Sequence, residues 1–292
     1  MSGTLQSLFF QARDGLNLHA LVLDGGAAPN NSAPVVCLPG LSRPARDFAV
    51  LTRFLGARTG RKIVALDYRG RGGSDWDPDW THYDFPTESA DIQTVVAALG
   101  VASAIFVGVS RGGLHAVMLA NQRPELVKAI VLGDIGPRLE PVGLTRIKDY
   151  IGRLPLLRDL DAAIRHYKSA MGGSFPAASD DDWRIYAQNS LNATPERMRL
   201  SYDPQLARTL DSFESSAPPI DFWPQFAGVA APVLALRGEC SDLLSADVHA
   251  EMAARLPACR LHVVPGQGHA PFLNDAPTLE RIAAFIDEVE GA

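Results

Sequence analysis

Hydrophobic and polar positions along the chain follow two different periods. Short runs that are continuously apolar, or that alternate apolar with polar residues, predict β-strands. Longer stretches with apolar residues every three or four positions predict helices. The predicted strands are residues 7–10, 16–23, 34–38, 63–67, 104–109, 129–132, 231–238 and 260–264. The predicted helices between them are residues 46–55, 88–99, 112–122, 245–256 and 277–289.

The order of these segments indicates the fold class. The first two strands flank Asp14-Gly15, a dipeptide typical of hairpin turns. From residue 34 onward, continuously apolar strands alternate with helices, which is the pattern of parallel strands covered on both faces. The sequence therefore predicts an α/β protein with a doubly wound, mostly parallel sheet.

The alternation is interrupted between residues 138 and 228. This segment has no strong strand pattern and shows helical spacing at 144–154, 158–171 and 181–191. We expect a helical insertion, so that residues 1–137 and 229–292 form the core domain and residues 138–228 form a cap or lid. An insertion at this point of the sheet lies over the carboxyl ends of the strands, where open α/β sheets bind ligands.

Composition excludes several classes of partner and site. The formal net charge is −6 and no long run of Lys or Arg occurs, so we expect no nucleic-acid partner. The three cysteines, Cys37, Cys240 and Cys259, form no Cys-x-x-Cys pair, which predicts buried free thiols and neither a disulfide framework nor a metal site. The first five residues do not resemble a signal peptide, and no apolar stretch is long enough to span a membrane. We expect a cytoplasmic monomer or small homo-oligomer that acts on a small molecule, without membrane contact.

One motif in the middle of the chain predicts a nucleophile. Gly108-Val109-Ser110-Arg111-Gly112 lies between the predicted strand 104–109 and the predicted helix 112–122. A Gly-x-Ser-x-Gly at a strand-to-helix turn exposes the serine hydroxyl above the sheet edge. Ser110 is therefore the candidate nucleophile.

A serine nucleophile needs a histidine base within hydrogen-bond reach. The chain has seven histidines, and six of them lie in predicted strands, predicted helices or a polar loop away from the sheet edge. His269 instead lies in a glycine-flanked loop directly after the last strand. We predict that His269 is the base and that His115 is a packed or partly exposed helix residue.

The base in turn needs an acid that holds its tautomer. Asp242 follows the strand after the insertion, and the order Ser110, Asp242, His269 matches the Ser, Asp, His order of hydrolases with this elbow. Asp242 is the predicted acid. Glu239 in the same turn and Asp134 at the end of the preceding strand are the alternatives, since a neighbouring strand end also approaches the histidine.

The oxyanion that forms during acyl transfer needs two N–H donors. The backbone N–H of Arg111, at the start of the helix after Ser110, is one expected donor. The second is expected from the sharp turn after residue 38, Pro39-Gly40-Leu41-Ser42-Arg43, and we predict the N–H of Leu41.

These motifs together resemble the α/β-hydrolase superfamily. The resemblance rests on Pro39-Gly40-Leu41, Asp67-Tyr68-Arg69-Gly70-Arg71-Gly72-Gly73-Ser74, Gly108-Val109-Ser110-Arg111-Gly112-Gly113, Arg237-Gly238 with Ser241-Asp242, and Gly268-His269. It implies an eight-stranded sheet, a helical cap between strands six and seven, a Ser-His-Asp triad and no cofactor. Relatives with aspartate at the elbow, the haloalkane dehalogenases and epoxide hydrolases, are excluded by Ser110.

The function that follows is hydrolysis of a small to medium carboxylic ester or lactone through an acyl-serine. Two alternatives remain: carbon–carbon bond hydrolysis of diketone acids by the same triad, and a non-enzymatic ligand receptor on a hydrolase scaffold. Arg111 either receives a substrate carboxylate or pairs with an Asp or Glu. Large apolar residues of the insertion either line a substrate pocket or form the core of the cap: Tyr150, Leu154, Leu157, Tyr167, Met171, Phe175, Trp183, Tyr186, Phe213, Phe222 and Trp223.

Overall fold

The computed structural model describes residues 4–26, 32–216 and 218–291. The first residues of the amino-terminal segment, on which the expectation about a signal peptide rests, lie outside this range. In the described part of the chain, no helix is both long and apolar enough to cross a membrane.

Eight strands form one mostly parallel sheet in the order β1-β2-β4-β3-β5-β6-β11-β12. β1 pairs antiparallel with β2, and β2 pairs antiparallel with β4; the remaining neighbours are parallel. This confirms the predicted opening hairpin and the doubly wound parallel sheet. The strands are β1 (Leu5–Gln11), β2 (Asn17–Leu23), β3 (Val35–Leu38), β4 (Ile63–Asp67), β5 (Ala104–Val109), β6 (Val127–Gly133), β11 (Val233–Gly238) and β12 (Cys259–Val264).

Successive residues of each central strand point into two different hydrophobic cores, because side chains alternate across a sheet. In β3, Val36 and Leu38 belong to the core that includes residues of the helices α2 (Phe85–Ala98), α3 (Arg111–Gln122) and α8 (Ala246–Arg255). Val35 and Cys37 belong to the core on the opposite face, which includes residues of α1 (Ala49–Thr59) and α9 (Ala276–Gly291). Both faces are therefore buried, which explains why these strands are continuously apolar in sequence.

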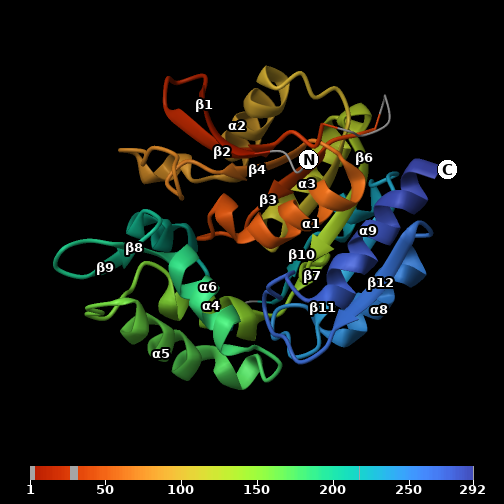
Figure 1. Ribbon diagram of the computed structural model, residues 1–292. Coiled ribbons are helices and arrows are strands. Elements are labelled where there is room, and N and C mark those ends of the chain that lie inside the picture. Colours follow the sequence, from red (N-terminus) through yellow and green to blue (C-terminus); the bar gives the residue numbers. More distant parts are fainter. Residues whose placement is uncertain (1–3, 27–31, 217, 292) are drawn as a thin grey trace.

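The helices of the core cover these two faces (Figure 1). Their order alternates with the strands as the hydrophobic pattern predicts, and they end within a few residues of the expected positions. They are α1 (Ala49–Thr59), preceded by the short 3₁₀ turn Ala45–Phe48, α2 (Phe85–Ala98), α3 (Arg111–Gln122), α8 (Ala246–Arg255) and α9 (Ala276–Gly291).

The segment between β6 and β11 contains four α-helices within the described residues, and residues 141–200 of it gather at one side of the sheet (Figure 1). The helices are α4 (Pro141–Tyr150), α5 (Leu160–Met171), α6 (Asp180–Ser190) and α7 (Trp223–Ala227). Four short strands, which the sequence did not predict, accompany them: β7 (Arg138–Leu139), β8 (Leu191–Ala193), β9 (Met198–Leu200) and β10 (Ile220–Asp221). β8 pairs with β9. β7 pairs with β10, so the two ends of the segment lie side by side.

Two further expectations can be compared with the fold. His115 is fully buried in α3, as predicted for a packed helix residue. Cys37 and Cys259 are buried free thiols, but Cys240 is exposed, so the expectation of a buried thiol is wrong there. Cys240 lies in the turn after β11, where the chain runs over the surface.

Candidate active site

The turn that carries Ser110 is a sharp strand-to-helix elbow between β5 and α3. Ser110 has φ 51° and ψ −118°, a conformation that non-glycine residues rarely adopt. The two flanking glycines make the turn possible. A Cβ on Gly108 would lie 2.4 Å from the carbonyl oxygen of Gly112, and a Cβ on Gly112 would lie 2.0 Å from the carbonyl oxygen of Leu38. The elbow motif therefore needs glycine at both positions for backbone packing, and the strain at Ser110 is the kind that marks functional sites.

His269 reaches Ser110 from the loop after β12. Its Nε2 lies 3.0 Å from the Oγ of Ser110, a hydrogen bond between residues 159 positions apart in sequence. The histidine is buried, at 8% exposure, whereas Ser110 is partly exposed. The predicted nucleophile and the predicted base are thus brought together.

Asp134 holds the other nitrogen of the imidazole. Its Oδ2 lies 2.7 Å from Nδ1 of His269, and the carboxylate is completely buried. Two further donors surround it: the N–H of Gly238 donates to Oδ1 at 2.8 Å, and the hydroxyl of Ser241 donates to Oδ2 at 2.6 Å. Because a carboxylate accepts and does not donate, Nδ1 of His269 carries the proton and Nε2 is free to accept from Ser110.

The prediction of Asp242 as the acid disagrees with this geometry, because its carboxylate binds another residue and not His269. Its carboxylate binds Arg146 of α4 in a bidentate ion pair, with Nε at 2.5 Å and Nη2 at 2.8 Å. Burial of Asp242 opposes ionisation, but the Arg146 guanidinium outweighs it and holds the pKa of that carboxyl below its ordinary value. The alternative Glu239 accepts from the N–H of Gly266 at 2.7 Å. Of the three candidate acids, Asp134 alone has a hydrogen bond to His269 in the structure.

The two expected oxyanion donors flank the nucleophile. A Cβ on Gly40 would lie 3.7 Å from the Cβ of Ser110, so the turn after β3 passes directly beside the serine. Leu41 lines the same cavity as Ser110, and in the described part of the chain its N–H donates to no acceptor. Arg111 is the first residue of α3, and the first N–H groups of a helix have no acceptor within it. The assignment of these two N–H groups as oxyanion donors stays a prediction.

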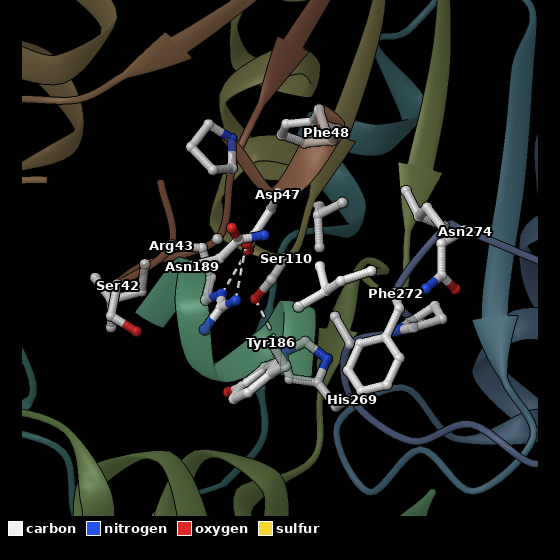
Figure 2. Close-up of a pocket in the computed structure, with 18 of the residues that line it drawn as sticks. Ser42, Arg43, Asp47, Phe48, Ser110, Tyr186, Asn189, His269, Phe272 and Asn274 are labelled. Carbon is white, nitrogen blue, oxygen red and sulfur yellow. Dashed lines mark hydrogen bonds and ion pairs between the residues drawn. The ribbon is translucent and has the colours of Figure 1, made fainter. Parts of the chain in front are cut away.

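A cavity opens in front of Ser110 and His269 and is walled by both the core and the inserted segment (Figure 2). Its lining away from Ser110 and His269 is mostly apolar, with Ser42, Arg43, Asp47, Asp182, Asn189 and Asn274 as polar exceptions. The other lining residues away from the triad include Phe48, Val50, Ile147, Tyr150, Met171, Ile185, Tyr186, Phe272 and Leu273. Of the large apolar residues of the insertion that the sequence offered, only Tyr150, Met171 and Tyr186 line this cavity.

The other aromatic residues of the insertion include members of a packed layer behind the cavity. Trp183 is 1% exposed and Phe175 is 3% exposed, and Phe175 stacks on Phe272 with ring centroids 5.0 Å apart. Tyr186 lies at the border of this layer and faces the cavity (Figure 2). The two alternatives for these residues therefore both occur, at different positions.

Arg43 also lines the cavity, although in the sequence it was predicted only as part of the turn after residue 38. Its guanidinium binds Asp47 with two hydrogen bonds, of 2.5 Å and 2.8 Å, and also donates to the hydroxyl of Ser190 on α6. The same guanidinium lies over the ring of Tyr186, 4.0 Å from its centroid. The spacing of Arg43 and Asp47, one helical turn apart, is the only signal in the sequence that could have suggested this pair.

Arg111 does not point its charge into the cavity. Its Nε donates to Oε2 of Glu88 at 2.6 Å, and Nη2 donates to the carbonyl oxygen of Tyr83 at 3.1 Å. Arg111 was expected either to receive a substrate carboxylate or to pair with an Asp or Glu, and in the structure it pairs with Glu88. A substrate carboxylate would have to compete with Glu88 for this guanidinium.

One group of three potential metal ligands occurs among the described residues, formed by Asp14, Asp77 and His82. Nη1 of Arg69 lies 2.9 Å from Asp14 and 2.6 Å from Asp77, so a fixed guanidinium already supplies positive charge there. This group lies outside the cavity of Ser110. Its carboxylates serve as partners of Arg69.

Comparison with known proteins gives the family. The family model described as alpha/beta hydrolase fold matches residues 33–276 of the chain. The chain belongs to the α/β-hydrolase family. It is therefore an α/β-hydrolase enzyme, as the resemblance in its motifs implies.

Three relatives of this α/β hydrolase illustrate the likeness. The 3-hydroxybutyrate-oligomer hydrolase of Cupriavidus necator is 31% identical over 282 residues, which cover 94% of this chain and 95% of that protein. The 2-(acetamidomethylene)succinate hydrolase of Mesorhizobium japonicum is 31% identical over 77% of this chain and 78% of its own length. The crystal structure of an alpha/beta hydrolase from Novosphingobium aromaticivorans superposes with a TM-score of 0.89 at 32% identity, covering 98% of this chain and 99% of that one.

Proposed function

We propose that this α/β hydrolase cleaves a small to medium carboxylic ester or lactone through an acyl-enzyme on Ser110. The observation that carries the proposal is the continuous hydrogen-bonded chain from Ser110 through His269 to the buried carboxylate of Asp134, with distances of 3.0 Å and 2.7 Å. A serine, a histidine with a fixed tautomer and a buried acid are the parts that nucleophilic acyl transfer requires.

In the proposed reaction the Oγ of Ser110 attacks the ester carbonyl carbon while Nε2 of His269 takes the hydroxyl proton. The carbonyl oxygen becomes an oxyanion that accepts from the N–H groups of Leu41 and Arg111. His269 gives its proton to the leaving alcohol as the bond from carbon to the ester oxygen breaks, and the acyl group remains on Ser110. Water then loses a proton to His269, attacks the acyl carbon and releases the acid, and the proton returns to Ser110. Asp134 stabilises the imidazolium that forms in both halves.

The cavity and the relatives support an ester whose acyl part is short and mainly apolar. The walls of the cavity are mostly hydrophobic side chains. Among its polar residues, Arg43 and Asp47 form an ion pair that carries no net charge, and Asp182 accepts a hydrogen bond from Asn274. The relative named 3-hydroxybutyrate-oligomer hydrolase covers nearly the whole chain, and an oligomer of a hydroxy acid is joined by ester bonds. Short oligomers of 3-hydroxy acids are therefore the first substrates to test.

We also propose that residues 138–228 act as a cap over this site. Seven cavity-lining residues of this segment support the role: Ile147, Tyr150, Met171, Asp182, Ile185, Tyr186 and Asn189. The ion pair between Arg146 and Asp242 ties α4 of the segment to the turn after β11. This contact gives Asp242 a structural part in the cap in place of the acid role expected from the sequence.

The experiment that tests the proposed nucleophile is labelling with a fluorophosphonate probe, which reacts with activated serines. Wild-type protein is expected to be labelled, with the adduct on Ser110, and Ser110→Ala is expected to be unlabelled. Ser7→Ala, which changes a serine on β1, is the control and should label like wild type. Folded wild-type protein that resists the probe would contradict the enzyme mechanism and favour a ligand receptor on the same scaffold.

A substrate panel then tests the reaction. We expect turnover of p-nitrophenyl esters with short acyl chains and of 3-hydroxybutyrate dimers and trimers, and no turnover by Ser110→Ala. Cleavage of a dienoic diketone acid with higher kcat/KM than any ester would instead favour the carbon–carbon hydrolase alternative.

A further inference from the structure

Glu88 is a fully buried carboxylate that lies beneath the elbow, on the first turn of α2. Its Oε2 accepts from Nε of Arg111 at 2.6 Å and from Nε2 of His115 at 2.9 Å. Its Oε1 forms an ion pair with Nη1 of Arg71 at 2.7 Å. One carboxylate thus joins residues of α3 to the loop after β4.

Arg71 extends this contact to the turn after β3. Its Nε donates to the carbonyl oxygen of Leu41 at 2.8 Å, and its Nη1 donates to the carbonyl oxygen of Arg69 at 2.6 Å. The N–H and the C=O of Leu41 lie on either side of one Cα. Holding the carbonyl against a buried, fixed guanidinium therefore restricts the direction in which the N–H of Leu41 points.

The same carboxylate of Glu88 also binds Arg111, the residue that follows Ser110. Besides Glu88, its guanidinium contacts the carbonyl of Tyr83 at 3.1 Å and lies 4.0 Å over the centroid of the Phe85 ring. These contacts anchor the first residue of α3, whose N–H is the other expected oxyanion donor.

We propose that Glu88 is a positioning residue for the oxyanion hole: through Arg71 it orients the N–H of Leu41, and through Arg111 it fixes the first N–H of α3. This inference rests on the proposed function, since it concerns the same oxyanion hole. Glu88 does not line the cavity itself and acts through its two arginines.

The charges of the cluster suit a rigid support. Burial of Glu88 opposes its ionisation, but Arg111 and Arg71 outweigh that effect and hold the pKa of its carboxyl well below the ordinary value. Burial lowers the pKa of His115 despite its contact with Glu88, so the imidazole is neutral and donates from Nε2. Nδ1 of His115 then accepts from the hydroxyl of Ser89 at 3.1 Å. An ionised carboxylate with charge-assisted hydrogen bonds is held more firmly than a neutral one.

The test compares Glu88→Gln with a matched control on the same helix, Asp91→Asn. Asp91 is also buried, and its carboxylate binds Arg69 of the same loop at 2.6 Å and 2.8 Å, but these contacts do not reach Leu41 or Arg111. In Glu88→Gln an amide N–H replaces one acceptor facing the arginines. We expect kcat for the best ester to fall by about 10- to 100-fold with KM unchanged, less than the roughly 10²–10³-fold lost when an oxyanion donor is removed.

A second readout separates positioning from general loss of stability. The affinity for a trifluoromethyl ketone, which binds as a tetrahedral adduct with an oxyanion, should fall by the same factor as kcat/KM, while the affinity for the product acid should not change. In Asp91→Asn we expect kcat close to wild type even if the melting temperature falls. Equal kcat losses in the two variants, or a Glu88→Gln effect on KM alone, would overturn the inference.

Two further variants keep the test decisive if Glu88→Gln does not fold. Arg71→Lys keeps the positive charge beside Glu88 but cannot also hold the carbonyl of Leu41, and Arg111→Met removes the anchor of the other donor while leaving its N–H in place. Wild-type kcat in a folded form of either variant would overturn the inference. Wild-type protein without Ser110-dependent turnover would overturn the proposed function as well, whereas active wild type with normal Glu88→Gln would overturn the inference alone.

Discussion

Asp134 lies 2.7 Å from His269, although the two residues are 135 positions apart in sequence. The aspartate has φ 52° at the end of β6, and this turn directs its carboxylate toward the imidazole. Asp242, in the turn after the neighbouring strand β11, is bound instead by Arg146 of the inserted segment. The structure therefore distinguishes two aspartates that both satisfy the chain order of a Ser-His-Asp triad.

The first prediction follows from this pair. In Asp134→Asn the amide cannot hold the required imidazole tautomer, so we expect kcat to fall by about 10³–10⁴-fold. In Asp242→Asn we expect kcat to change by less than about tenfold, because the contact that is lost is the ion pair with Arg146 of the inserted segment. Ester hydrolysis under single-turnover conditions checks both variants. The reverse order of effects would restore Asp242 as the acid.

The second prediction concerns the glycine after the nucleophile. Gly112→Ala would place a Cβ 2.0 Å from the carbonyl oxygen of Leu38 and 2.8 Å from that of Pro39, neither of which is a flexible side chain. We expect the free energy of unfolding to fall by roughly 3 kcal/mol or more, with loss of activity. Chemical denaturation measures the change. Gly173→Ala, where a Cβ meets nothing within 4 Å, is the control and should be close to wild type.

The third prediction is the pH dependence of stability. The pKa of Glu88 is lower in the folded protein than in the unfolded chain, so the unfolded chain takes up a proton first as the pH falls below about 4.5. The stability that Glu88 contributes is present above that pH and is lost progressively in acid. Glu88→Gln should therefore reduce the slope of the free energy of unfolding against pH between roughly 5 and 3.

Asp91 is the control for this pH experiment because its shift has the opposite sign. Burial raises its pKa despite the contact with Arg69, so the folded protein takes up this proton more readily than the unfolded chain. Asp91→Asn should therefore make the acid-side slope steeper. Equal slopes for the two variants, measured by urea denaturation at a series of pH values, would contradict the assigned directions.

The fourth prediction concerns substrate size. Tyr186 contributes a wall of the cavity between Arg43 and Phe272, with 4.0 Å from the guanidinium to its ring centroid and 5.6 Å between the two aromatic centroids. Tyr186→Ala should enlarge the cavity and move the optimum of a p-nitrophenyl ester series to longer acyl chains, with lower kcat/KM for the shortest. Leu156→Ala, at an exposed position of the same segment, should leave the profile unchanged.

Much of the fold could be predicted from the sequence because local patterns carry it. Apolar runs from residue 34 onward predict parallel strands, and the two alternating runs before them predict a hairpin; together these eight predicted segments became the eight strands of the sheet. Ser110 and His269 were also predictable, since each lies in a turn directly after a strand and the carboxyl ends of parallel strands meet at one edge. The short strands β7 to β10 were not predictable, because two or three residues are too few for a periodic pattern.

The identity of the carboxylate that binds His269 could be decided only by the tertiary structure, because it depends on contacts between distant segments. Asp134 and Asp242 follow adjacent strands and have the same residue type, so no local pattern separates them. The choice depends on the left-handed turn at Asp134 and on Arg146, which arrives from the inserted segment. In the same way Glu88 is an ordinary helix residue in sequence and becomes the link between Leu41 and Arg111 only when α2, α3 and two loops pack together. The sequence by itself determined the candidate nucleophile and base and the edge of the sheet where they lie, whereas long-range packing decided which carboxylate contacts the histidine and which residues surround the site.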